Sequence, residues 1–339
     1  MNENRKRQIE FGDFQTPDDL ALNVCQRLAG LGICPDIVIE PTCGIGSFIV
    51  AACQTFPQAN EIYGFEINHN YLDVLRARLT YIENAERVRL KQTDFFATDW
   101  HTTIGKLNGS VLVIGNFPWV TNSTQSIIGA NNLPEKTNFQ GHNGFEAISG
   151  KANFDISEWM LLEVLRWFKG RVGNVAMLIK TAVARKILAH AERQGTAVQD
   201  AFMISIDAKK HFGAAVEACL LVMCFTDNTQ KPNHDYMIFD SLYDEKGRRV
   251  GHRGGLIVGD LATFSECAFL VGQSPQKWRS GVKHDASAVM EFTHTAHGLK
   301  NGFGEVVEIE SDYLFPLLKG SDIGGSLSVG FIKHYVSDW

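Results

Sequence analysis

The stretch that decides the fold is V-L-V-I-G-N-F-P-W, which runs from Val111 to Trp119. Its first four residues, 111–114, are apolar and mostly β-branched, which predicts a strand buried on both faces. Gly115 loosens the backbone where this strand should end, and Asn116 is the first polar side chain after it. Pro118 forces the residue before it into extended geometry. Ligands bind beyond the carboxyl ends of strands in open α/β sheets, so this turn is a candidate site. The alternative is a plain strand-to-loop turn in which the Asn caps the backbone.

Length and composition restrict the class of protein. The 339 residues indicate two domains, or one large domain with an elaboration. A net charge of −6 gives no bulk attraction to nucleic acid or to anionic membranes, so any such contact needs a local patch. Seven cysteines without close pairs favour reduced thiols over disulfides or a zinc site. The polar N-terminus is not a signal peptide, and no apolar run approaches the ~20 residues of a membrane span. These features predict a soluble, cytoplasmic protein without a metal.

A second informative stretch, I-V-I-E-P-T-C-G-I-G-S-F, covers residues 37–48. It predicts a buried strand at 37–39 that ends in Glu40, then a glycine turn at Gly44 and Gly46, then an apolar helix. Neither G-x-G-x-x-G nor G-K-[ST] is present, so this is not a standard phosphate loop. A carboxylate beside the crevice repels phosphate but suits a ligand with an ammonium and a sulfonium group, such as S-adenosylmethionine.

Acidic residues also follow the next two predicted strands. Glu66 lies about twenty residues past the glycines, where an acid accepts hydrogen bonds from ribose hydroxyls. Asp94 follows the third strand and can accept from an adenine amino group, while Phe95 or Phe96 covers the ring. Any one such acid is more often a solvated strand-end residue. Three acids at successive strand ends, followed by N-F-P-W at a fourth, predict a nucleoside-binding crevice.

The rest of the chain supports an α/β fold. The alternation of elements predicts a mostly parallel, doubly wound, Rossmann-like sheet up to a boundary near 228, where short strands and Gly-rich turns begin. We therefore expect one domain at 1–228 and a smaller β-rich region at 229–339. Thr16 is the expected N-cap of the first helix, with proline at its first position. Further predicted elements are helices at 18–31, 71–82, 156–168 and 181–194, and strands at 61–66, 88–90, 174–179 and 204–207, with a long apolar strand ending at Phe225.

Together these motifs resemble those of one family, the S-adenosylmethionine-dependent DNA methyltransferases that methylate amino groups. The closest likeness is to the adenine N6 enzymes of restriction–modification systems, in which the cofactor half precedes the catalytic half (the γ order). The fold implied is that of a class I methyltransferase. The matching segments are F-Q-T-P at 14–17, E-P-T-C-G-I-G-S-F at 40–48, F-E-I at 65–67, D-F-F at 94–96 and N-F-P-W at 116–119.

The resemblance assigns roles to individual residues. Asn116 and the Phe117 carbonyl would accept hydrogen bonds from the target amino group, within the catalytic turn Asn116, Phe117, Pro118 and Trp119. The target base would be flipped out of the duplex and stacked by Trp119 and Phe212. Phe117 replaces the first proline of the family pattern, which keeps the carbonyl but loses a fixed φ. The residues assigned to the cofactor are Thr16, Glu40, Pro41, Thr42, Cys43, Gly44, Gly46, Glu66, Ile67, Asp94 and Phe95.

The region after 228 resembles the start of the family's target-recognition region in two segments, 278–287 and 316–323. The resemblance implies duplex DNA as substrate and a cognate restriction endonuclease as partner. Arg279 and Lys283, in a local basic cluster, are candidate DNA contacts. The chain stops at an aromatic, strand-like segment, so we expect a piece of a longer protein with an incomplete recognition region.

Two other functions remain open on the sequence. The same N-x-P-[YFW] pattern serves enzymes that methylate a glutamine amide in protein or a guanine amino group in RNA. The chain could also be a methylase-like module that mainly binds DNA, with weak catalysis. The extra residues after 228 favour DNA.

Overall fold

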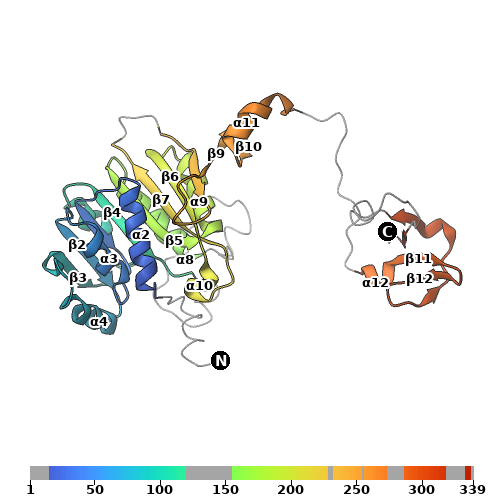
Figure 1. Cartoon of the computed structure of the whole chain (residues 1–339), viewed down its shortest axis with the longest axis horizontal. Coiled ribbons are helices and arrows are strands. Elements are labelled where there is room, and N and C mark those ends of the chain that lie inside the picture. Colours follow the sequence, from blue (N-terminus) through green and yellow to red (C-terminus); the bar gives the residue numbers. More distant parts are fainter. Residues whose placement is uncertain are drawn as a thin grey trace. The chain divides into compact units, whose positions relative to one another are not determined.

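The computed structural model describes residues 15–119, 155–227, 232–253, 256–272, 286–317 and 333–336. The chain divides into two compact units, Met1–Leu270 and Val271–Trp339. The first unit is a twisted sheet with helices on both of its faces (Figure 1). Within the described ranges, no helix is long and apolar enough to cross a membrane.

The main sheet carries its strands in the order β3-β2-β1-β4-β5-β7-β6. Strands β1 to β6 run in one direction and β7 is antiparallel to both of its neighbours. This is the Rossmann-like arrangement of a class I methyltransferase, so the predicted fold class is confirmed. The strands are β1 (Ile37–Glu40), β2 (Glu61–Glu66), β3 (Val88–Gln92), β4 (Val111–Asn116), β5 (Gly173–Lys180), β6 (Val198–Ile206) and β7 (Ala218–Phe225).

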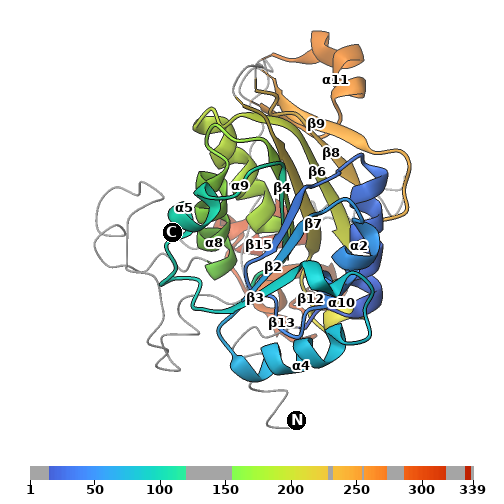
Figure 2. The same ribbon diagram turned by 90° about the vertical axis from the view of Figure 1, so that its left-hand side faces the viewer.

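Helices cover both faces of this sheet, as Figure 2 shows for α2 on one side and α8 and α9 on the other. Each face has its own apolar cluster, because side chains along a strand alternate between the two faces. One cluster contains α2 (Asp18–Gly30), α3 (Ser47–Thr55), α4 (His69–Leu79) and α10 (Ala208–Phe212), and the other contains α5 (Trp100–Gly105), α8 (Ile156–Trp167) and α9 (Thr181–Arg193).

Strand β4 lies in the middle of the sheet, between β1 and β5. Its residues Val111 to Ile114 are all fully buried. Leu112 and Ile114 belong to the cluster under α2 and α3, whereas Val111 and Val113 belong to the cluster under α8 and α9. The unbroken apolar run is therefore explained by burial on both faces, as the sequence predicts.

The first unit continues beyond the boundary expected near 228. Strand β8 pairs in parallel with β6, β9 pairs with β8, and β10 pairs with β9. The compact unit accordingly ends at Leu270 instead of 228. The change in composition near 228 marks the end of helix–strand alternation, but the strands that follow extend the same sheet. These elements are β8 (Tyr236–Phe239), β9 (Arg248–Arg253), β10 (Leu256–Val258) and α11 (Leu261–Cys267).

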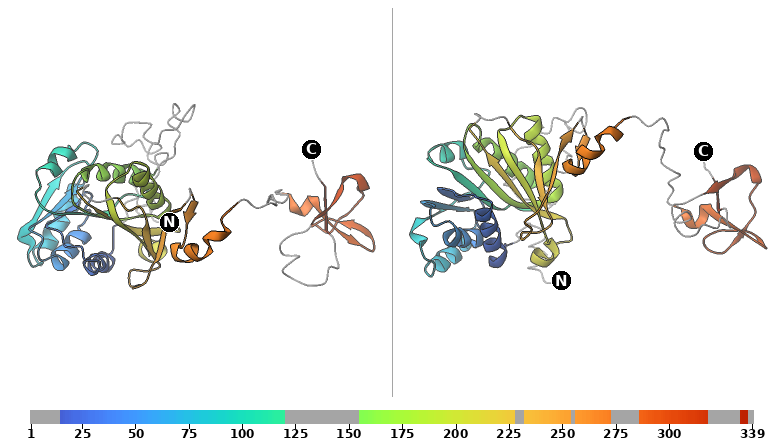
Figure 3. Two further views of the ribbon diagram at one scale, coloured as in Figure 1. Left: turned by 90° about the horizontal axis from the view of Figure 1, so that it is seen from above. Right: turned by 45° about the horizontal axis from the view of Figure 1, so that its top comes forward.

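The second unit contains a small antiparallel sheet in the order β13-β12-β11-β15-β14, which appears in two further views in Figure 3. Phe292 and Leu299 are its buried apolar side chains among the described residues. The elements are α12 (Ser287–Met290), β11 (Glu291–Thr295), β12 (Gly298–Lys300), β13 (Val306–Val307), β14 (Leu314–Leu317) and β15 (Lys333–Val336). Single 3₁₀ turns lie at Ala85–Arg87, Ala268–Leu270 and Ser311–Tyr313.

Candidate active site

Four polar residues lie along the carboxyl edge of the sheet. Glu66, Glu40 and Asn116 are the last residues of β2, β1 and β4, which are neighbours in that order. Asp94 follows the adjacent strand β3 by two residues. The carboxyl ends of parallel strands meet at one edge, so topology brings together groups that are far apart in the sequence. This edge is the candidate active site.

The glycine turn adopts backbone conformations that suit glycine. Gly44 and Gly46 have φ values of +52° and +84°, in the left-handed region. A Cβ at Gly46 would collide with α4, and one at Gly44 would collide with Gln15. The Gln15 side chain accepts a hydrogen bond from the Ile45 amide (3.1 Å). The segment before α2 therefore closes over the glycine turn, which the sequence alone does not indicate.

Glu66 holds the same turn from the other side. Its carboxylate accepts from the Gly44 amide at 2.9 Å and from the Asn68 amide at 2.8 Å, one on each oxygen. Each carboxylate oxygen has a second lone pair, so the group can still accept from the hydroxyls of a ribose. Ile67 follows directly and is half exposed (51%), which offers an apolar surface beside the acid.

Glu40 is a buried acid (3% exposed) whose Oε2 has no hydrogen-bond partner among the described residues. The same holds for the buried Oγ1 of Thr42. Burial raises the pKa of Glu40 well above its usual value, and the charge of Glu66 raises it further. A buried carboxylate needs a positive partner. The site therefore fits a ligand with a cationic group, as S-adenosylmethionine has.

The side chain of Asn116, at the end of β4, contacts the segment before α2. Its Nδ2 donates to the Oγ1 of Thr16 at 3.3 Å. The expectation that Thr16 caps α2 is wrong, because Pro17 occupies the cap position and no side chain caps the helix. The Thr16 hydroxyl contacts the N-F-P-W segment instead. A Cβ added at Gly115, just before Asn116, would lie 3.6 Å from the Cγ of Glu40.

The two phenylalanines after Asp94 are not equivalent. Phe95 is buried (5% exposed) and packs edge-to-face on Phe117, with ring centroids 5.7 Å apart. Phe96 is half-buried, and its amide donates to Asp94 Oδ1 at 2.8 Å. Phe96 is thus the more exposed of the two rings, and the assignment of Phe95 to the cofactor site stays a prediction. The D-F-F motif does not say which phenylalanine faces the core.

Trp119 and Phe212 come together as the sequence predicts, but not as two parallel faces. Their rings meet edge-on, with centroids 5.0 Å apart and an interplanar angle of 69°. Trp119 is buried (6% exposed), and its indole N–H donates to the Leu178 carbonyl at 3.3 Å. A base held between two rings needs them roughly 7 Å apart, twice the van der Waals spacing. Stacking by both rings thus requires Trp119 and Phe212 to separate.

Cys43 lies inside the glycine turn and is buried (4% exposed). Burial raises the pKa of its thiol, with the charge of Glu40 as a second cause. The thiolate is the reactive form of cysteine, so this environment suits a packing residue and not a nucleophile. Pro41, before it, is also buried.

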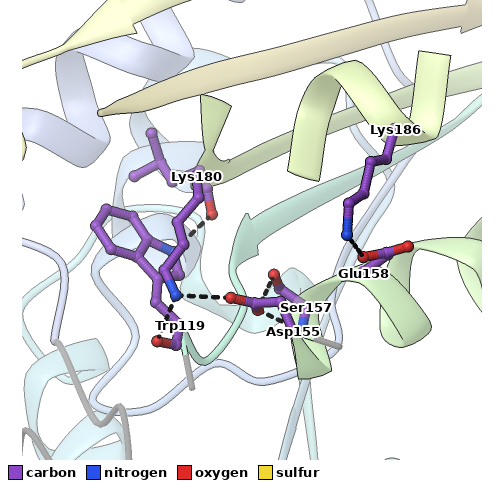
Figure 4. A network of polar contacts seen from close by, with 7 residues as sticks. Trp119, Asp155, Ser157, Glu158, Lys180 and Lys186 are labelled. Atoms are coloured by element: carbon purple, nitrogen blue, oxygen red, sulfur yellow. Dashed lines mark hydrogen bonds and ion pairs between the residues drawn. The ribbon is translucent and has the colours of Figure 1, made fainter. Parts of the chain in front are cut away.

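Two charged residues at this edge were missed from the sequence. The Lys180 ammonium donates to the Trp119 carbonyl (3.0 Å) and to Asp155 Oδ2 (2.7 Å), as Figure 4 shows. Lys180 is the last residue of β5, and a lysine at the end of an apolar strand is the one signal that could have identified it. Arg279 and Lys283, the candidate DNA contacts, lie outside the described residues.

Comparison with known proteins gives a second line of evidence on the kind of protein. The chain matches no family profile. It is 45% identical over 317 residues to the type II methyltransferase M.NspV of Nostoc sp. (strain ATCC 29411 / PCC 7524), which covers 93% of this chain. Over this length the chain is similar to a type II methyltransferase. The resemblance inferred from the motifs is therefore confirmed, and S-adenosylmethionine is the cofactor that this family implies. The chain spans 65% of the length of M.NspV.

Solved structures with similar folds include a type I restriction–modification methyltransferase subunit from Streptococcus thermophilus. It is 17% identical, with a TM-score of 0.47 over 76% of this chain and 52% of that one. TrmK from M. capricolum, in complex with S-adenosyl-homocysteine, is 10% identical, with a TM-score of 0.36 over 58% of this chain and 64% of that one. The strand order, and not these scores, identifies the fold of this chain.

Proposed function

We propose that this protein transfers a methyl group from S-adenosylmethionine to the N6 atom of adenine in duplex DNA. The observation that carries the proposal is the N-F-P-W turn, with Asn116 at the end of β4 beside the acids of β1 and β2. The type II name of the relative M.NspV supports a site-specific activity in a restriction–modification system. A cognate restriction endonuclease is then the expected partner in the cell.

The target amine is a weak nucleophile because its lone pair is delocalised into the ring. The Asn116 side-chain oxygen and the Phe117 carbonyl would accept its two N–H bonds and so localise the lone pair on nitrogen. The hydrogen bond from Asn116 Nδ2 to Thr16 would fix the orientation of the amide, with the NH2 group turned to Thr16 and the oxygen as the acceptor for the target amine. Positioning and fixed dipoles then supply most of the acceleration.

Phe117 replaces the first proline of the family pattern, and the packing of its side chain would hold its backbone carbonyl in place. Its ring is almost fully buried (1% exposed) and packs against Phe95. A buried ring restrains the backbone of its residue, whereas proline restrains φ directly. We infer that packing here replaces the lost ring constraint, so the Phe117 carbonyl keeps a fixed position.

The cofactor supplies an electrophilic methyl group on a sulfonium when it is bound. Glu66 would accept from its ribose hydroxyls, and Asp94 from its adenine amino group, with Ile67 and Phe96 against the ring. Glu40 would face the cationic amino acid end, because its buried Oε2 has no partner among the described residues. The glycine turn lets the backbone approach the ligand closely.

The DNA substrate must lose a base from its stack, because the adenine amino group is hidden in the duplex. Trp119 and Phe212 are the aromatic residues proposed to receive it. Unit Val271–Trp339 is the proposed target-recognition region, and Arg279 and Lys283 are its proposed phosphate contacts. Phosphate contacts would supply affinity without sequence information.

The direct test is the incubation of the full chain with unmethylated bacterial genomic DNA and S-adenosylmethionine, followed by mass spectrometry of the digested DNA. N6-methyladenine is the expected product. N4-methylcytosine with untouched adenine would overturn the choice of atom and leave the fold standing. Parallel reactions with total RNA and with a cell protein extract test the two other substrate classes. Cofactor binding without methyl transfer to any of them would indicate a DNA-binding module.

A further inference from the structure

We propose that Lys180 is a positioning residue for methyl transfer, which holds the N-F-P-W turn through the backbone of Trp119. This inference rests on the proposed function, since the turn matters only if it carries the chemistry. Lys180 touches none of the groups proposed to bind the target amine or the cofactor. It acts through the Trp119 carbonyl, to which its ammonium donates at 3.0 Å.

The end of β5 holds the turn at three points. Leu178 lies opposite Asn116 in the parallel register of β4 and β5. The Leu178 carbonyl accepts from the Trp119 indole at 3.3 Å. Lys180, two residues further and so on the same face of the strand as Leu178, binds the Trp119 carbonyl. The end of β4, the indole ring of Trp119 and the backbone carbonyl of Trp119 are thus all held by β5.

The ammonium of Lys180 is itself fixed. It forms an ion pair with Asp155 at 2.7 Å, in which the Asp155 side chain is only 8% exposed and that of Lys180 24%. Asp155 is the N-cap of α8 and accepts from the Ser157 amide (3.1 Å) and hydroxyl (2.5 Å). A carboxylate held by a helix start keeps the lysine in place, and charge-assisted bonds are roughly twice as strong as neutral ones.

Fixing Trp119 determines the geometry of the residues before it. Asn116 is held by the β4 ladder, and Pro118 has a restricted φ. The Phe117 carbonyl, between these two, is therefore held from both sides once Trp119 is anchored. A displacement of about 1 Å at a reacting group can cost on the order of a hundredfold in rate. Loss of the anchor should thus slow the chemical step.

The structure offers a matched control in Lys186. It pairs with Glu158 at 2.8 Å, and Glu158 is as buried as Asp155, with a side chain 6% exposed. Both ion pairs join α8 to the segment that contains the end of β5 and α9, as Figure 4 shows. The Lys186 pair does not involve Trp119. Removing Lys186 therefore removes a second ion-pair tether of α8, whose lysine is more exposed (55% against 24% for Lys180), and leaves the turn held.

The experiment compares the full-length parent with Lys180→Met, Lys180→Arg and Lys186→Met. Methyl transfer from tritiated S-adenosylmethionine to unmethylated genomic DNA is measured in single turnover, and cofactor affinity by calorimetry. We expect Lys180→Met to slow transfer at least tenfold with cofactor affinity within twofold of the parent. Lys180→Arg should recover most of the rate, and Lys186→Met should match the parent. The Trp119 indole N–H resonance should shift in Lys180→Met only.

Parental transfer rates in Lys180→Met would overturn the inference and leave the proposed function intact. An equal slowing in Lys186→Met would also overturn the inference and leave the proposed function intact, since the loss of rate would then reflect a general loss of stability. If the parent itself transfers no methyl group, the proposed function fails, and an unshifted indole resonance in Lys180→Met would refute the anchor as well. If Lys180→Met does not fold, Lys180→Gln is judged by the same measurements.

Discussion

The side chains of Asn116 and Thr16 lie 100 positions apart in the sequence and meet at 3.3 Å, with Nδ2 of Asn116 as donor to Oγ1 of Thr16. Thr16 does not cap α2 in this arrangement, and Asn116 is the last residue of β4. The contact joins the segment before α2 to the end of β4. It thereby links the F-Q-T-P and N-F-P-W segments, which the sequence shows only as separate matches to the family pattern.

Asn116→Ala should abolish most of the methyl transfer and spare cofactor binding. Loss of one acceptor at a developing charge costs on the order of 10² in rate, as for one oxyanion-hole donor. Calorimetry with S-adenosylmethionine and a single-turnover assay on the same preparation measure the two effects. Substantial residual turnover would mean that Asn116 is only a turn residue.

Thr16→Val should slow the same step to a smaller extent. One neutral hydrogen bond contributes about 0.5–1.5 kcal/mol, so the rate should fall about 2- to 12-fold. If Thr16 acts by orienting the amide, it should have no further effect in the Asn116→Ala background. An equal loss in both backgrounds, or a loss of cofactor affinity alone, would assign Thr16 to the cofactor instead.

The edge-on contact of Trp119 with Phe212 predicts that base capture opens this ring pair. Stacking on an aromatic ring contributes about 1–3 kcal/mol per base. DNA with 2-aminopurine at the target adenine should brighten on binding as the base leaves its stack, and dim as Trp119 stacks on it. Trp119→Ala should leave the bright signal, and Phe212→Ala should weaken binding of flipped DNA. Unchanged fluorescence in every protein would contradict base flipping at this site.

Glu66→Ala should weaken S-adenosylmethionine binding by about 1–3 kcal/mol, because ligand hydroxyls lose a buried acceptor. The same change removes the acceptor of the Gly44 and Asn68 amides, so the melting temperature should fall too. Asp73→Ala is a suitable control, since Asp73 is an exposed acid on α4 that pairs with Arg76. Calorimetry that finds parental affinity in Glu66→Ala would remove Glu66 from the cofactor site.

Glu40 should make stability depend on pH. Its pKa is raised by burial and by Glu66, so above about pH 4.3 the unfolded chain loses this proton before the folded protein does. The stability that protonated Glu40 contributes is present in full below the pKa that Glu40 has in the unfolded chain. This stability declines as the pH rises towards the higher pKa of Glu40 in the folded protein. Urea unfolding between pH 5 and 8 should show a steeper decline for the parent than for Glu40→Gln. Parallel profiles would mean that Glu40 ionises normally.

The sequence by itself determined most of the elements and the edge of the sheet on which the candidate site lies. V-L-V-I predicted a doubly buried strand, and residues 111–114 are fully buried. Helices expected at 156–168 and 181–194 end within one residue of α8 and α9. These predictions succeed because periodicity and glycine or proline positions are local properties, and parallel strands share a carboxyl edge.

Only the tertiary structure decided which side chains face one another. The D-F-F motif does not separate buried Phe95 from half-buried Phe96, and Thr16 carries the signature of a cap but contacts Asn116. The unit boundary moved to Leu270 because β8 pairs with β6. Lys180 reaches Trp119 because β5 lies beside β4, and pairing between strands distant in the chain leaves no mark in either segment. Packing across the sheet, which local pattern does not encode, determined these contacts.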